Sequence, residues 1–305
     1  MTETLRVGTR RSVLARRQTA LVLHALRRAD PTVRFRVVPL VTQGDRSPAT
    51  VDGLDFTDTI DRALEEGRID IAVHSAKDLP VRTTRAVTVA AFPRRADPRD
   101  GLVLRRSRTL RSLAPGARIG SSSARRRAQL LRARSDLEVV EVRGNVDSRL
   151  ALVRRGTVDG VILAVAGLER IGRIGAVTEV LDRQRFLPAP GQGALAVATR
   201  SNDRDRAERL AAVDDPSTRA AVTAERAFVD AIGGDCDTPL GALARVRGGE
   251  LTLRAEVLSV DGRRAVGGVR VGGAATATVI GVSLARDLLD AGAGGLLGQR
   301  GVTEG

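Results

Sequence analysis

Residues 69–80 read IDIAVHSAKDLP, and this stretch indicates the fold class of the chain. IDIAVHS is a short apolar run typical of a buried strand, and Pro80 closes the turn that follows it. Polar residues therefore stand at the carboxyl end of a strand, where open α/β sheets bind their ligands. Lys77 is the only lysine among 50 basic residues, so this position has kept a residue that the rest of the chain avoids.

Two readings of this turn remain open. An ammonium is a compact charge whose pKa responds to its surroundings, and Asp78 beside it can act as a general acid or base or stabilise positive charge. Alternatively, Asp78 only forms the turn and Lys77 is solvated. His74 by itself favours a structural role.

The same strand-then-helix pattern runs through the first two-thirds of the chain. Strands are predicted at 5–9, 35–41, 69–75 and 87–92, and again at 117–123, 137–144 and 159–165. Helices are predicted at 12–28, from about 124, and at 146–155, with Ser12 as the N-cap of the first. This alternation predicts parallel α/β sheets.

Two breaks in the pattern predict where the chain crosses between lobes. FPRRADPRD (92–100) is the first, and LPAPGQG (187–193) is the second. The tail differs, with a helix at 216–231, strands at 241–247 and 250–259, and a helix at 276–290. We predict two α/β lobes joined by two hinge strands, with a cleft between them, and a small C-terminal α+β domain. The predicted bounds are 1–95 with 193–213, then 96–192, then 214–305.

Composition narrows the classes of partner. A length of 305 residues indicates two or three domains, and 42% hydrophobic residues can form a sizeable, aliphatic core. The net charge of +14 is compatible with nucleic-acid binding. However, the chain has five Phe and no Trp or Tyr, so few aromatic side chains could stack on bases, and no CxxC zinc spacing occurs. We expect no nucleic-acid partner and no metal. The apolar runs are too short to span a bilayer, no signal-peptide segment is present, and a single cysteine suits a reducing compartment, so we expect the cytoplasm.

Three strand-helix junctions are basic. GSSSARRRAQL (120–130) places Ser122, Ser123, Arg125 and Arg126 at a helix N-terminus, which attracts anions. VRGNVDSRL (142–150) and GTRRS (8–12) repeat the arrangement. Each could also be a capped helix with a solvated basic face. Together they predict one ligand with many carboxylates, or several copies of one ligand, because arginine binds carboxylates in a bidentate fork.

GGDCDTPLG (233–241) holds Cys236, the only cysteine, between Asp235 and Asp237. A buried structural cysteine is the usual case. Here the loop is polar, and two carboxylates disfavour the thiolate. This setting favours a thiol that is consumed once in a covalent attachment over a nucleophile that turns over.

These motifs, in this order, resemble the porphobilinogen deaminase (hydroxymethylbilane synthase) family of tetrapyrrole biosynthesis. The resemblance covers most of the chain and rests on GTRRS, AVHSAKDLP, DPRDGLV, GSSSARRRAQL, VRGNVDSRL, AVAGLERIG, LPAPGQGAL, TAERAF and CDTPLGALA. It implies two lobes like those of periplasmic binding proteins and a third domain that carries the cysteine.

The resemblance implies a transferase that condenses four porphobilinogen units head to tail, with loss of ammonia, to give linear hydroxymethylbilane for haem and corrin synthesis. It implies a dipyrromethane cofactor joined to Cys236 by a thioether, and a cytoplasmic protein that we expect to be a monomer. Asp78 would stabilise cationic intermediates, and Lys77 would contact a ligand carboxylate. Cofactor and substrate would be held by Arg10, Ser12, Gln18, Phe56, Ser75, Ser121, Ser123, Arg125, Arg126, Arg143, Gly144, Arg149, Arg170 and Gln192.

The sequence departs from the family pattern at two places. The segment 46–56, RSPATVDGLDF, is shorter than the usual Gly-rich lid and lacks its lysine, and Asp235 precedes the cysteine where glycine is usual. A second hypothesis is therefore a divergent paralogue that binds or makes a different pyrrole or polycarboxylate product, with weak or no polymerising activity. A solute-binding protein of the periplasmic type is a third, which the missing signal peptide and the third domain disfavour.

Overall fold

The computed structural model describes residues 3–41, 58–81, 84–234 and 237–297. These residues form two compact units, one of residues 1–96 with 193–219 and one of 97–192 with 220–305. The chain passes between the units after residues 96 and 192, inside the two predicted crossovers, and again after 219. No helix among the described residues is long and apolar enough to cross a membrane.

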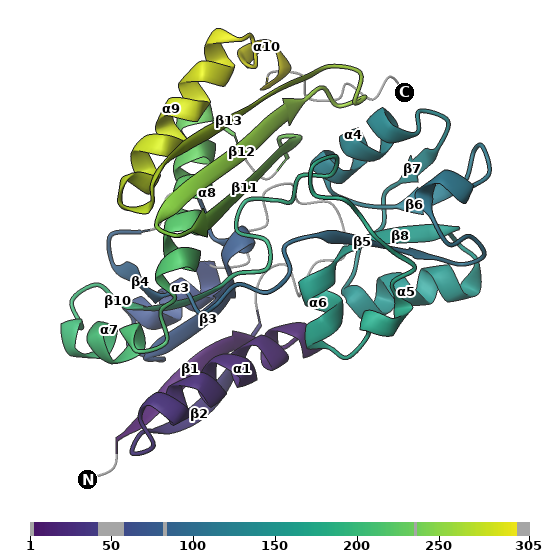
Figure 1. Ribbon diagram of the computed structural model, residues 1–305. Helices are drawn as coiled ribbons and strands as arrows, with labels where there is room; N and C mark the ends of the chain where they lie inside the picture. The colour runs from purple at the N-terminus through teal and green to yellow at the C-terminus, as the bar shows by residue number, and fades with distance from the viewer. Residues whose placement is uncertain (1–2, 42–57, 82–83, 235–236, 298–305) are drawn as a thin grey trace. The chain divides into compact units, whose positions relative to one another are not determined.

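The first unit is built on a five-stranded mixed sheet (Figure 1). Its strand order is β2 (Arg34–Leu40), β1 (Thr4–Arg10), β3 (Ile71–Ser75), β10 (Leu195–Arg200) and β4 (Val87–Ala91). The helical elements of this unit are α1 (Val13–Ala29), α3 (Asp58–Glu65), η1 (Ala76–Asp78) and α7 (Arg204–Ala211). β1 is parallel to both β2 and β3, so their carboxyl ends lie at one edge of the sheet.

Helices pack on both faces of this sheet. Val22, Leu23 and Leu26 of α1 share one hydrophobic cluster with β1 and β3, and Ile60 and Leu64 of α3 belong to another with Ile69 and Ala72. The helix predicted at 12–28 is confirmed, because Ser12 accepts a hydrogen bond from the backbone of Ala15 at 3.2 Å and so caps α1. The sequence reading missed α3 and α7.

The second unit contains a sheet with an equivalent arrangement. Its order is β7 (Glu138–Val140), β6 (Arg118–Gly120), β8 (Gly160–Ala164), β5 (Asp100–Leu104) and β9 (Glu179–Val180). Its helical elements are η2 (Leu110–Ser112), α4 (Ala124–Ala133), α5 (Val146–Arg155), α6 (Val165–Arg170) and η3 (Ile174–Ala176). β6 is parallel to β7 and β8, whereas β5 is antiparallel to β8.

In each sheet the fourth strand is the antiparallel one. β10 and β5 are also the strands that the chain enters directly after a crossover. A strand entered from outside the sheet has no βαβ crossover to its neighbour, and it is such crossovers that make β1, β2 and β3 parallel. The purely parallel sheets that the alternation predicted are therefore mixed sheets.

The second unit also holds a three-stranded antiparallel sheet of β11 (Leu240–Arg247), β12 (Glu250–Leu258) and β13 (Ala265–Gly273). The remaining helical elements are α8 (Pro216–Ile232), η4 (Ala274–Thr276), α9 (Ala277–Asp290) and α10 (Gly294–Leu297). α8 and α9 cover one face of the sheet around Phe228, Leu253 and Leu284 (Figure 1). β13 was missed from the sequence because its AVGGVRVGG run is rich in glycine, which weakens the strand signal. The predicted fold class, two α/β lobes and a small C-terminal α+β domain, is confirmed.

Candidate functional site

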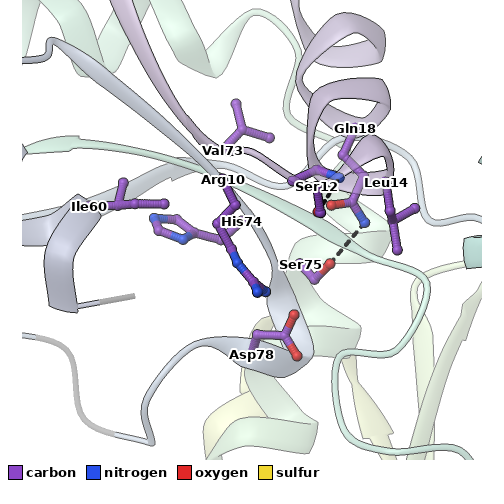
Figure 2. Close-up of a pocket in the computed structure, with 10 residues that line it drawn as sticks. Arg10, Ser12, Leu14, Gln18, Ile60, Val73, His74, Ser75 and Asp78 are labelled. Atoms are coloured by element: carbon purple, nitrogen blue, oxygen red, sulfur yellow. Dashed lines mark hydrogen bonds between the residues drawn. The ribbon is translucent and has the colours of Figure 1, made fainter. Parts of the chain in front are cut away.

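The first cluster of predicted site residues lies at the carboxyl ends of β1 and β3. A small cavity of about 60 Å³ is lined there by Arg10, Ser12, Gln18, Ser75 and Asp78, among others (Figure 2). β1 and β3 are parallel neighbours, with Gly8 paired to Ala72, so the residues that follow each strand emerge side by side. The structure thus brings together five residues that are separated by up to 68 positions in the sequence.

Polar contacts hold the walls of this cavity in place. The Gln18 amide, buried on α1, donates a hydrogen bond of 2.9 Å to the Ser75 hydroxyl at the end of β3 (Figure 2). The backbone N–H of Ala76 donates to the carbonyl of Ala194 on the other side of β3, at 3.0 Å. The turn that carries the acidic residue is therefore tied both to α1 and to the segment that enters β10.

Asp78 ends η1 and is exposed, so its carboxylate is accessible to a ligand. Figure 2 shows the side chains of Arg10 and Asp78 pointing toward one another. Lys77, in the same turn, is half-buried and is not among the residues that line the cavity. The cavity accordingly offers both charges, a guanidinium on β1 and a carboxylate on η1.

A buried histidine-aspartate pair lies at the same cavity. His74 lines it, and its Nε2 is 3.3 Å from Oδ1 of Asp61 on α3. Both residues are buried, so this contact lies in the interior between β3 and α3. The sequence reading took His74 as structural, and it missed Asp61 because α3 was not predicted. An acidic residue on the buried face of the 58–65 pattern was the available signal.

The second cluster lies in the other unit, at the carboxyl end of β6. Ser123 caps α4 by accepting from the backbone N–H of Arg126 at 3.5 Å, and the buried Ser121 hydroxyl accepts from the Ser123 N–H at 3.2 Å. Both hydroxyl oxygens therefore accept hydrogen bonds from backbone N–H groups in the turn that begins α4. The capped-helix reading of this junction is right about the cap, but Arg125 and Arg126 are buried and do not form a solvated basic face.

Arg125 and Arg126 are buried and share one carboxylate. Asp100, on β5, is fully buried, and its two oxygens lie 2.8 Å from Arg125 and 2.7 Å from Arg126. The amide of Gln192 also donates to Asp100, at 2.9 Å. Two guanidinium groups and this amide hold the pKa of Asp100 well below its usual range, although burial alone would raise it. Burial lowers the pKa of Arg125, because it removes water from the cation.

One carboxylate therefore faces two cations, and the group keeps an excess positive charge. The predicted ligand residues Arg125, Arg126 and Gln192 are in contact with Asp100, which sequence reasoning did not single out although it lies in the DPRDGLV motif. Their role toward a ligand stays a prediction.

The junction after β7 adds Arg143, Gly144 and Arg149. Gly144 adopts a φ of 103°, which favours glycine, and its carbonyl accepts from Nε of Arg149 at 3.0 Å. Arg149 also donates to the Ser122 hydroxyl at 3.2 Å, so it joins this junction to the one before α4. Arg143 is exposed and pairs with Glu141 at 2.8 Å.

The electrostatics of this second cluster favour an anion. Burial and the charge of Arg126 lower the pKa of Arg149, and burial lowers that of Arg170 at the end of α6. A partly desolvated cation beside a like charge is stabilised when a ligand brings negative charge. The residues that follow β6, β7 and β8 together form a basic edge of the sheet, at the end where open α/β sheets bind their ligands.

Phe56 and Cys236 lie outside the described residues, as do the shortened segment 46–56 and Asp235. The predicted packing of Phe56 on a ring and the attachment at Cys236 stay predictions.

Comparisons with known proteins agree along the whole chain. Residues 5–208 match the family model "Porphobilinogen deaminase, dipyromethane cofactor binding domain", and residues 219–290 match "Porphobilinogen deaminase, C-terminal domain". A porphobilinogen deaminase of Roseiflexus sp. (strain RS-1) is 46% identical over 302 residues, covering 97% of this chain and 99% of the relative. That of Thermus thermophilus is 43% identical over 295 residues, covering 96% and 98%.

Among solved structures, the methionine-binding protein MetQ aligns with 68% of this chain and 88% of its own, at a TM-score of 0.46 and 11% identity. A likeness at that level carries no argument about ligand or activity.

Proposed function

Because the chain belongs to the porphobilinogen deaminase family, we propose that it condenses four porphobilinogen molecules head to tail and releases linear hydroxymethylbilane. Each condensation forms one carbon-carbon bond between an aminomethyl carbon and a pyrrole α-carbon, expels ammonia and loses the α-proton. Water then releases the tetrapyrrole, so four ammonia molecules leave for one water consumed. We assign the enzyme to the transferases and its pathway to tetrapyrrole biosynthesis.

The observation that carries the proposal is the basic edge of the second sheet. Each porphobilinogen ring brings an acetate and a propionate, so a growing chain is a polycarboxylate. Arg149 and Arg170 are partly desolvated cations with lowered pKa values, and the Arg125–Arg126–Asp100 group keeps an excess positive charge. Ligand carboxylates are attracted to this positive charge, and guanidinium groups bind carboxylates in bidentate pairs.

We propose that Asp78 stabilises the positive charge that develops when ammonia leaves. Its carboxylate is exposed at a turn braced by Gln18 and Ser75, so it can approach a ring nitrogen without moving the backbone. Such fixed charge acts mainly by electrostatic stabilisation of the transition state. Arg10, which lines the same cavity, would bind a ring carboxylate beside it. Lys77 would bind another.

The family model names a dipyrromethane cofactor, and the basic residues of the second sheet fit a group with several carboxylates. When bound, the dipyrromethane supplies the terminal pyrrole from which the product is extended. We propose that Cys236 holds it through a thioether, because Cys236 is the only thiol in the chain. Ser12, Ser121, Ser123, Arg143, Gly144, Gln192 and Phe56 complete the proposed set of binding residues.

We also propose that the protein works as a cytoplasmic monomer, without a nucleic-acid partner. Its proposed domains are 1–95 with 193–213, then 96–192, and 214–305 for the domain that carries the cysteine.

Intact mass and turnover test the proposal together. The purified protein should weigh more than its sequence by one dipyrromethane and should react with Ehrlich's reagent. Cys236→Ser should lose both properties. The wild-type protein, given porphobilinogen, should form hydroxymethylbilane and release one ammonia molecule for each porphobilinogen consumed. An unmodified wild-type protein with a titratable thiol would overturn the attachment at Cys236, and a modified protein that makes no tetrapyrrole would overturn the reaction.

The second outcome would favour a divergent paralogue that binds a pyrrole polycarboxylate or makes a different product. The short segment 46–56 and Asp235 motivate this alternative. It predicts the extra mass and the colour with Ehrlich's reagent but little or no tetrapyrrole.

A further inference from the structure

A second cavity, of about 340 Å³, lies in the unit that contains α4 and the three-stranded sheet, apart from the residues proposed for catalysis. Its polar lining consists of Gln129, Arg132, Gln184, Arg185, Arg254 and Glu256. Three elements contribute, namely the second half of α4, the segment before Phe186, and β12. A volume of this size lies at the lower end of the range for small-molecule sites.

The buried carboxylate of this cavity is already satisfied. Glu256 is 7% exposed, and Arg132 approaches its two oxygens at 2.8 and 3.2 Å. The amide of Gln129 donates to the same carboxylate at 2.9 Å. Arg132 and Glu256 therefore neutralise each other, and the remaining charge of the lining comes from Arg185 and Arg254.

Those two guanidinium groups have no side-chain or carbonyl partner among the described residues. Both side chains are exposed at the cavity, and no carboxylate of the described segments pairs with them, so the lining carries a net charge of about +2 from three arginines and one glutamate. A solvated arginine on a convex surface is common and means little. Two unpaired guanidinium groups that line one concave site create a positive electrostatic potential there. Such a potential favours an anionic ligand over a neutral one.

The backbone around both arginines is well held. Arg132 donates to the carbonyl of Arg185 at 3.0 Å, and the carboxylate of Asp182 accepts from the backbone N–H groups of Gln184 and Arg185 at 2.7 and 3.3 Å. Arg254 lies in the middle strand of its sheet, paired with Leu243 on one side and Val269 on the other. The main conformational cost of binding would therefore be the entropy lost when the side chains of Arg185 and Arg254 are ordered.

We propose that this cavity binds a small oxyanion with at least two negative charges, either a phosphate compound or a di- or tricarboxylate. Arg185 and Arg254 would each present a fork of N–H donors to it, and the Arg132–Glu256 pair would form the floor. None of its residues belongs to the proposed substrate or cofactor set, although Gln129 accepts a hydrogen bond from Arg125 of that set at 2.9 Å.

Isothermal titration calorimetry of the intact purified protein tests the proposal, with inorganic pyrophosphate and citrate as two separate probes. We expect one or both to bind the wild type. The double variant Arg185→Gln/Arg254→Gln should weaken binding at least tenfold, because it removes two charge-assisted contacts. A preference for pyrophosphate would identify the natural ligand as a phosphate compound, and a preference for citrate as a polycarboxylate.

Arg263→Gln is the matched control, because it removes one arginine charge from an 88% exposed side chain in the β12–β13 turn, outside the cavity. It should leave the affinity within about twofold, since exposed pairs contribute little. Far-UV circular dichroism verifies that all variants fold. The proposal is overturned if neither anion binds, if the double variant binds as tightly as the wild type, or if Arg263→Gln lowers the affinity as much as the double variant.

Discussion

Replacement of Asp100 by asparagine should destabilise the second unit more than any other single loss of charge that we consider. The carboxylate is fully buried, and it is the shared partner of Arg125 and Arg126 at 2.8 and 2.7 Å. Asparagine keeps the shape and one carbonyl oxygen. It removes the negative charge, and two buried cations then face each other without compensation.

The size of the effect follows from that geometry. Breaking a buried ion pair by removing one partner typically costs about 3–5 kcal/mol, because the other charge stays buried and unpaired. The remaining amide oxygen can still accept one hydrogen bond, so we expect the free energy of unfolding to fall by about 3 kcal/mol, the lower end of that range. In a chain of this size that corresponds to a fall in Tm of roughly 6–12 °C.

Asp97→Asn is the matched control, three residues earlier in the chain. Asp97 pairs with Arg99 at 2.6 Å, but the two side chains are 25% and 41% exposed. An exposed pair contributes about 0–1 kcal/mol. Urea unfolding followed by far-UV circular dichroism should therefore separate the two variants clearly. Equal midpoints for the two variants would refute the reasoning that burial sets the strength of the Asp100 contacts.

The dependence on pH gives a second check. The pKa of Asp100 is well below its usual range in the folded chain, so its ionisation stabilises the fold at every pH above the unfolded value of about 4. That contribution is lost as the pH falls from there toward the folded pKa. The stability gap between wild type and Asp100→Asn should be constant from pH 8 to pH 5 and should begin to narrow near pH 4. A gap that widens on acidification would contradict the sign of this linkage.

Three further predictions concern function and packing. Asp78→Asn should fold and carry the cofactor but turn over about 10²- to 10³-fold more slowly in a steady-state assay, because a charge-stabilising group is lost; Lys77→Arg should also lose activity, and full activity would make the lone lysine an accident of composition. Grafting a longer Gly- and Lys-containing segment in place of 46–56 should lower KM for porphobilinogen by excluding water and removing Asp52 and Asp55, and an unchanged KM would count against any effect of the short segment. Gly281→Ala should lower stability by about 1–3 kcal/mol in urea unfolding, because its Cβ would lie 2.3 Å from the carbonyl of Ala224, whereas Gly295→Ala meets nothing within 4 Å and should be nearly neutral.

Local pattern was enough to predict several of the elements that carry the candidate site residues, although not α3 or α6. The strand predicted at 69–75 is β3 at Ile71–Ser75, and the helix predicted at 146–155 is α5 with the same bounds. Ser12 was recognisable as a helix cap, because capping depends on residues three positions apart. The edge at which ligands would bind also followed from the sequence, since it depends only on where parallel strands end.

The partners of the charged residues could not be read in the same way. Asp100 lies 25 and 26 positions from Arg125 and Arg126, and Asp61 lies 13 from His74, so no periodicity links them. The sequence by itself determined that basic residues follow three of the predicted strands, because apolar periodicity and capping act over a few residues. Only the tertiary structure decided which arginines pair with a carboxylate inside the protein, as Arg125 and Arg126 do with Asp100, because a charge is paired by whatever distant segment the fold brings within about 3 Å of it.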